Sequence, residues 1–193
     1  MITPAPSALA RNLRRMHARE DVLDQLDFYW DQWRPHLDGL TDEEYFWEPA
    51  PGCWSVRPTD RGHEFDFAFP EPTPPPFTTI AWRLCHIADH VLAMRVSNHF
   101  GDGSYRIDHT HYPAGATVAL KHLDHQHRQW RDCIGGMDAE AWSRPVGAAE
   151  GPFADRPYLA LVLHLNRELI HHGAEVSLLR DLYRASGGAH FQR

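Results

Sequence analysis

The sequence predicts an all-α protein, and the arrangement it favours is a four-helix bundle. Four long segments repeat apolar residues at steps of three and four, which is the period of an amphipathic helix. Glycines follow each of these segments, and no alternating strand pattern exceeds about four residues. We therefore expect one domain over residues 1–193, with residues 1–6 and 187–193 frayed.

Four predicted helices and two short helical turns follow one another along the chain. The helices cover residues 7–37, 79–100, 116–134 and 156–185, and the short turns cover residues 41–46 and 138–142. Thr79 is a residue type that caps helix N-termini, so it marks the start of the second helix. Thr41 and Glu44 form a capping-box pattern at the first short turn.

The segment between the first two helices is rich in proline. Eight prolines fall within residues 48–77, and proline is excluded from helix interiors. The same segment carries Trp54, Phe65, Phe67 and Phe69, which a free linker would not need. We expect a long proline-rich loop that packs back onto the helices.

Composition excludes several functional classes. The net charge is −7, so the basic surface of a nucleic-acid-binding protein is missing. No apolar run approaches the roughly 20 residues that a membrane span needs. The first 20 residues have no apolar core typical of a secretory signal, so we expect a cytoplasmic protein. Three widely spaced cysteines are expected to be reduced thiols.

Histidines and a glutamate within the apolar stripes predict a metal site. Glu168 and His172 lie one turn apart on the buried face of the last predicted helix. His86 and His90, also one turn apart, border the buried face of the second. Two imidazoles and one carboxylate form the ligand set of a catalytic zinc site, so we expect His86, Glu168 and His172 to bind a divalent metal. The same donors suit iron, nickel or manganese, and a purely structural Glu–His pair stays an alternative.

The remaining histidines receive separate predictions. His90 and His171 are the candidates for catalytic proton transfer, and His164 is placed to orient Glu168. His127 is expected to face inward. Residues 122 and 125 are predicted at the surface, residues 109 and 111 on a loop that could contact substrate, and residues 17, 36, 63, 99 and 190 in solvent.

Three stretches resemble the DinB/YfiT-like metal-binding superfamily. They are Leu-Cys-His-Ile-Ala-Asp-His at 84–90, Glu-Leu-Ile-His-His-Gly-Ala-Glu-Val at 168–176, and Trp-Glu-Pro-Ala-Pro-Gly-Cys-Trp-Ser-Val at 47–56. The resemblance implies a four-helix bundle, often a homodimer, with one metal ligand from the second helix and two from the fourth. Those positions are His86, Glu168 and His172. Glutamate rather than histidine at 168 resembles the mycothiol-dependent maleylpyruvate isomerase branch.

This resemblance implies a thiol-dependent S-transferase or isomerase that acts on a small electrophile. A low-molecular-weight thiol such as mycothiol would be the cosubstrate. Two alternatives keep the same ligands: a metal-dependent hydrolase of a small amide or ester, and a metal-binding stress-response protein without turnover. We expect a small-molecule substrate and a homodimer, with no nucleic-acid or membrane partner.

Overall fold

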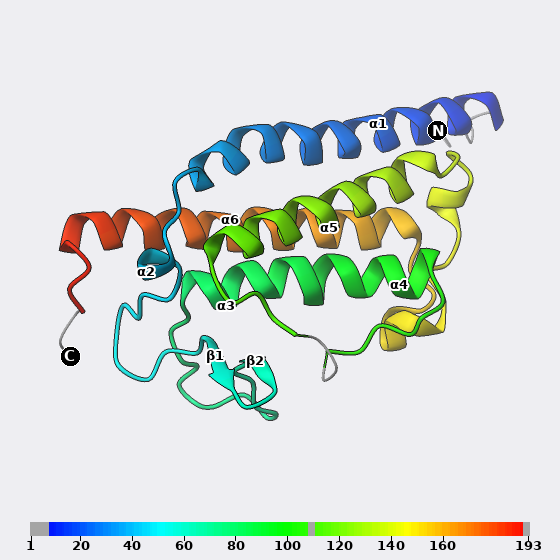
Figure 1. The fold of residues 1–193 in the computed structure, drawn as a ribbon. Helices are drawn as coiled ribbons and strands as arrows, with labels where there is room; N and C mark the ends of the chain where they lie inside the picture. The colour runs from blue at the N-terminus through cyan, green and yellow to red at the C-terminus, as the bar shows by residue number, and fades with distance from the viewer. Residues whose placement is uncertain (1–7, 108–110, 191–193) are drawn as a thin grey trace.

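The computed structural model describes residues 8–107 and 111–190, with side chains described from residue 17 onward, and these residues are mostly helical (Figure 1). The α-helices are α1 (Ala8–Trp33), α2 (Asp42–Tyr45), α3 (Ile80–Cys85), α4 (Met94–Phe100), α5 (Ala116–Gly136) and α6 (Tyr158–Ser186). Segments η1 (Arg34–Leu37), η4 (Ala141–Ser143) and η5 (Ala148–Phe153) are 3₁₀-helical, and η2 (His86–Ala93) is π-helical. The long helices begin and end within a few residues of their predicted bounds.

The long helices lie side by side in Figure 1. Helices α1, α5 and α6 are three of them, and α3, η2 and α4 join without a break to form the fourth. That fourth rod, which we call the central rod, contacts both α5 and α6, and α6 also packs on α1. No helix in the described part of the chain has the length and apolar character needed to cross a membrane.

The core fills the space between these rods with large apolar side chains. The bulkiest residues with almost no exposed area include Leu26, Leu37, Tyr45, Ile87, Leu123, Trp130, Ile134, Leu165 and Leu169. They come from every rod, and their three- and four-residue spacing along each helix is the pattern seen in the sequence. Because Leu165 and Leu169 are buried in this core, the adjacent Glu168 and His172 of α6 lie toward the central rod.

A two-stranded hairpin is the exception to the all-α prediction. Strands β1 (Val56–Thr59) and β2 (Gly62–Phe65) pair antiparallel within the segment predicted as a loop. The alternating pattern was too short to predict strands. Pro58 is tolerated in β1 because both strands are edges of the sheet. The segment packs back onto α3, because the Trp82 indole N–H donates to the Asp66 carbonyl at 2.8 Å and the Phe65 ring stacks on Trp82.

The end of α6 is held by the start of the proline-rich segment. Gly187 adopts the left-handed conformation that ends many helices, with φ 61°. The Trp47 indole N–H donates to the Gly188 carbonyl at 3.0 Å, and His190 Nδ1 lies 2.6 Å from the Glu48 carbonyl oxygen. Residues 187–190 of the predicted frayed tail are thus hydrogen-bonded, while residues 1–6 and 191–193 lie outside the described residues.

Gly173 allows α1 and α6 to approach closely. A Cβ at this position would lie 2.9 Å from Trp33 Cε2 and closer still to the Tyr29 hydroxyl. We expect Gly173→Ala to lower the free energy of unfolding by about 1–3 kcal/mol, because the rigid indole cannot move away in a packed core. The measurement is urea unfolding. The control is Gly136→Ala, where a Cβ meets nothing within 4 Å; equal effects at the two positions would contradict the prediction.

Candidate metal centre

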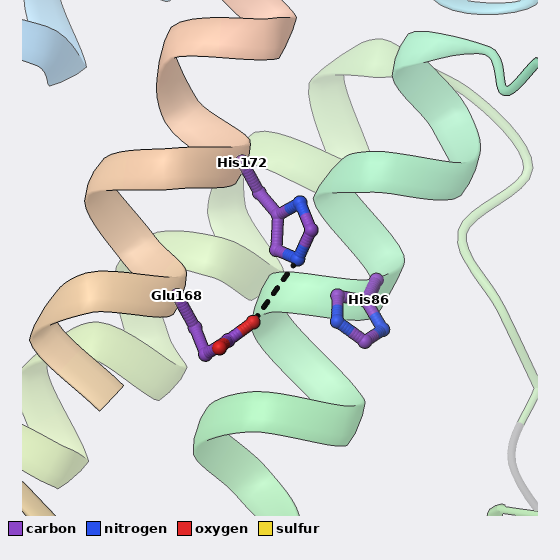
Figure 2. A group of neighbouring side chains, drawn as sticks. All are labelled: His86, Glu168 and His172. Atoms are coloured by element: carbon purple, nitrogen blue, oxygen red, sulfur yellow. Dashed lines mark ion pairs between the residues drawn. The ribbon is translucent and has the colours of Figure 1, made fainter. Parts of the chain in front are cut away.

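Three predicted ligands meet between the central rod and α6. His86 is the first residue of η2, and Glu168 and His172 lie one turn apart on α6. Figure 2 shows their side chains pointing toward one another from the two rods. One donor atom from each of the three residues lies within 4.8 Å of the other two. The sequence-predicted set is therefore brought together in space.

His172 is held by a carboxylate on each side. Its Nε2 lies 3.2 Å from Glu168 Oε2, as Figure 2 marks, and its Nδ1 lies 2.7 Å from Glu175 Oε2. When Nδ1 carries the proton and donates it to Glu175, the lone pair of Nε2 faces Glu168 and His86. Arg83 Nε forms an ion pair with the same Glu175 oxygen at 2.9 Å. The sequence placed Glu175 among the inward polar residues of the last helix but gave it no role, and it gave none to Arg83.

The His86 imidazole is buried and neutral. Its ring stacks on Trp82, with centroids 5.1 Å apart and an interplanar angle of 10°, and its edge meets the His172 ring at 4.7 Å. Burial, together with the nearby His172 and His90, lowers the pKa of His86 to about 3. Among the described residues, none forms a hydrogen bond with its ring nitrogens. A neutral imidazole with a free lone pair is the form that binds metal.

The Glu168 carboxylate is ionised at neutral pH. Burial raises its pKa, but the hydrogen bond from Arg167 and the charges of His164 and His172 outweigh burial, so the pKa lies below its ordinary value. Arg167 donates to Oε1 at 2.7 Å, and His164 Nδ1 lies 3.4 Å from the same oxygen. The second oxygen, Oε2, faces His172. His164 thus lies where the sequence placed it, beside the carboxylate.

His90 lies beside His86 under an aromatic cover. The two imidazole centroids are 5.5 Å apart. His90 Nε2 is 2.9 Å from the Tyr112 hydroxyl, and Phe65 of β2 meets the His90 ring edge-on at 4.4 Å. Burial lowers the pKa of His90 to about 4 although Asp89 opposes the shift, so the ring is neutral at pH 7. Tyr112 had no sequence signal, because it lies in a loop outside every periodic segment.

His171, the other predicted proton-transfer residue, lies on the solvent side of the centre. Its side chain is 63% exposed, and its Nε2 lies 3.4 Å from Glu175 Oε1. It forms a second possible donor group with His172 and Glu175, separate from His86 and Glu168. The two candidates predicted for proton transfer therefore occupy very different environments.

The other histidines divide between the core and the surface. The prediction that His99 is solvated is wrong: its side chain is 2% exposed, with Nε2 2.9 Å from Glu150 Oε1 and Nδ1 3.1 Å from the Tyr158 hydroxyl. The reason is that η5 folds back over α4, a path that periodicity does not reveal. His127 is buried as predicted, but on the α1 side of α5. His109 lies outside the described residues.

His122 forms an ion pair with a carboxylate that is fully buried. Its Nε2 lies 2.8 Å from Asp89 Oδ1, which also accepts a hydrogen bond from the Tyr105 hydroxyl at 2.7 Å. The hydrogen bond with Asp89 raises the pKa of His122 above its ordinary value, although burial opposes this. His122 was predicted at the surface, and its side chain is 29% exposed.

The His122–Asp89 pair predicts a pH-dependent stability difference. Because the folded pKa of His122 is raised, its contribution is complete below the unfolded pKa of about 6.5 and is lost as pH rises through the folded pKa. We expect the loss of stability in His122→Gln, measured by urea unfolding, to be largest near pH 6 and to shrink at higher pH. A difference that grows with pH would contradict this sign. His125→Gln, on the exposed side of α5, is the control.

Comparison with known proteins gives one match. A family model described as the DinB superfamily matches residues 25–176, which is most of the chain and includes every residue of the candidate centre. Searches of curated proteins and of solved structures find no match.

Proposed function

The chain belongs to the DinB superfamily, and on that premise we propose that His86, Glu168 and His172 bind a divalent cation. The observation that supports this proposal is that one donor atom from each of the three side chains lies within 4.8 Å of the other two. Ligands about 2.1 Å from one ion are at most about 4.2 Å apart, so small side-chain rotations bring all three to one ion. Zinc is the favoured ion for two imidazoles and one carboxylate, with iron, nickel and manganese as alternatives. We take the four rods as a four-helix bundle around this site.

The proposed activity is thiol-dependent S-transfer or isomerisation of a small electrophile, with a low-molecular-weight thiol of the mycothiol type as cosubstrate. Glutamate at position 168 between two histidine ligands supports this class. A divalent cation bound there would coordinate the thiol and hold it in its deprotonated, nucleophilic form. The protein side chains then have to exclude water, orient the ligands and move protons.

The aromatic cover and His90 are suited to those tasks. Trp82 stacks on His86, and Phe65 stacks on Trp82 with centroids 4.7 Å apart, so one flank of the centre is apolar. The Tyr112 hydroxyl lies 3.5 Å from the Ile107 carbonyl, to which it donates. In the tautomer whose Nε2–H donates to this hydroxyl, Nδ1 of His90 is the proton acceptor. His90 is therefore our first choice for proton transfer and His171 the second.

Turnover with and without thiol tests the proposed activity. The zinc-loaded protein is incubated with a panel of small electrophiles, with and without a low-molecular-weight thiol. We expect product only when both metal and thiol are present, and less product in His90→Gln at unchanged metal content. Product without thiol would instead support hydrolysis. Stoichiometric metal with no product under either condition would support a metal-binding protein without turnover.

Glu175 is expected to orient His172 for the metal. Removing a carboxylate that holds a ligand histidine costs roughly 10–100-fold in metal affinity. Glu175→Ala should therefore weaken zinc binding by about that factor, measured by competition with a chromophoric chelator. Glu175→Gln keeps an acceptor oxygen for Nδ1–H and should recover part of the loss. Glu140→Ala, at an exposed position on the chain, is the control; equal affinities in all variants would contradict the role.

A further inference from the structure

A pocket lies between α1 and α5, away from the candidate metal centre. It is lined by Trp30, Lys121, Asp124, His127, Arg128 and Arg131, and its volume is about 430 Å³. None of these residues belongs to the group formed by His86, Glu168 and His172. Sites for small molecules in proteins measure roughly 300–1,000 Å³, so the pocket is large enough for an organic ligand.

Two cationic side chains at this pocket have no ion-pair partner in the described part of the chain. Asp124 is neutralised by Arg34, whose Nε and second terminal nitrogen reach its two oxygens at 2.6 and 3.1 Å. Arg131 is neutralised by Asp27 through a similar pair of bonds at 2.6 and 2.7 Å. Within the described ranges, neither Lys121 nor Arg128 has an ion-pair partner. Lys121 and Arg128 are therefore the lining cations that no described carboxylate pairs with, while Asp38 shares Arg34 with Asp124, and Asp24 and Asp132 lie near Arg131.

His127 adds a polar group with an unmet hydrogen-bonding need. His127 is 6% exposed, and its ring stacks on Trp30 with centroids 3.6 Å apart and planes within 4° of parallel. Its Nε2 is buried without a hydrogen-bond partner. Such a group costs roughly 1–3 kcal/mol, so packing alone gives no reason for histidine here. Burial lowers the pKa of His127 to about 4, so at pH 7 the ring is a neutral donor and acceptor.

We propose that this pocket binds a small organic anion through Lys121 and Arg128, with the Trp30–His127 stack as the wall beside its carbon skeleton. A guanidinium pairs with two oxygens of a phosphate or carboxylate, and an ammonium adds a compact positive charge. The pocket is larger than a single phosphate group requires, which leaves room for an organic part. The inference is independent of the metal centre and of the proposed reaction.

The sequence offers a direct probe, because Lys121 is its only lysine. Reductive methylation with ¹³C-formaldehyde labels this amine and the α-amino group of the chain. Inorganic phosphate, pyrophosphate and citrate are then titrated in separate NMR experiments, so that phosphate and carboxylate ligands are distinguished. We expect a saturable shift of the Lys121 signal with pyrophosphate or citrate while the α-amino signal stays constant. No saturable shift with any of the three probes would overturn the proposal.

Matched variants separate a site from general attraction of anions, with affinities measured by calorimetry on unlabelled protein. Arg128→Ala should weaken binding at least 10-fold, whereas Arg184→Ala, which removes the same charge from an exposed position of α6, should change it less than 2-fold. His127→Phe keeps the stack on Trp30 and should change binding less than 2-fold, whereas His127→Ala removes this wall and should weaken binding several-fold. Equal losses in the two arginine variants would contradict a built site.

Discussion

Replacing His172 with alanine is expected to lower the divalent metal in the purified protein from about one ion per chain to under about a tenth of that. His172 contributes the nitrogen that lies between Glu168 and His86, and Glu175 fixes the orientation of its ring. Without it, one imidazole and one carboxylate on different rods remain, and two ligands hold a divalent ion weakly. Elemental analysis after dialysis against zinc and then against metal-free buffer gives the measurement.

His171→Ala is the matched control for this experiment. The two histidines are neighbours in the sequence, but the His171 side chain is 63% exposed, whereas that of His172 is 9% exposed. The control variant should keep its metal, and its turnover then tests whether His171 transfers protons. Retention of metal by His172→Ala, or equal loss in both variants, would contradict the ligand assignment.

The largest expected effect on stability is at Arg180. Its side chain is 3% exposed and that of Glu44 is 5% exposed, with Nε–Oε1 at 2.6 Å and the second nitrogen–oxygen pair at 3.0 Å. The same guanidinium also donates to the carbonyls of His36 and Asp38. Arg180→Met would leave the Glu44 carboxylate buried without a partner, so we expect the free energy of unfolding to fall by about 3–5 kcal/mol.

Urea unfolding of two further variants tests the reason for this loss. If the cost is the uncompensated charge, the double variant Arg180→Met with Glu44→Leu should recover much of the stability. Arg61→Ala breaks an exposed ion pair with Glu64 and should cost less than about 1 kcal/mol. A double variant as unstable as Arg180→Met alone would assign the effect to packing instead.

The helices and the three candidate ligands could be predicted because both follow helical periodicity. A four-residue step places Glu168 and His172 on the same side of α6, and their position within the apolar stripe turns them toward the neighbouring rod. The same argument placed His86 at the border of the buried face of the second predicted helix. The prediction of the ligand group needed only that these two buried faces meet.

Contacts made by irregular segments could not be predicted in this way. Tyr112 reaches His90 from a loop, and Glu150 reaches His99 from η5. Glu44 was expected to complete a capping box with Thr41; Thr41 does accept from the Glu44 N–H at 3.2 Å, but the Glu44 carboxylate binds Arg180. Each partner lies far away in sequence, so its choice depends on the path of the whole chain.

The π-helical turns of η2 change the direction in which side chains point along the central rod. Such turns carry more residues per turn than the α-helix, so a residue after Ala93 points in a different direction from the one that an unbroken α-helix would give it. His86 follows directly on α3 and faces α6. Arg95 and His99 lie after η2, in α4, and contact Glu150. The extra residues per turn in η2 thus rotate the side chains of α4 relative to those of α3. One continuous rod can therefore contact α6 through His86 and η5 through Arg95 and His99.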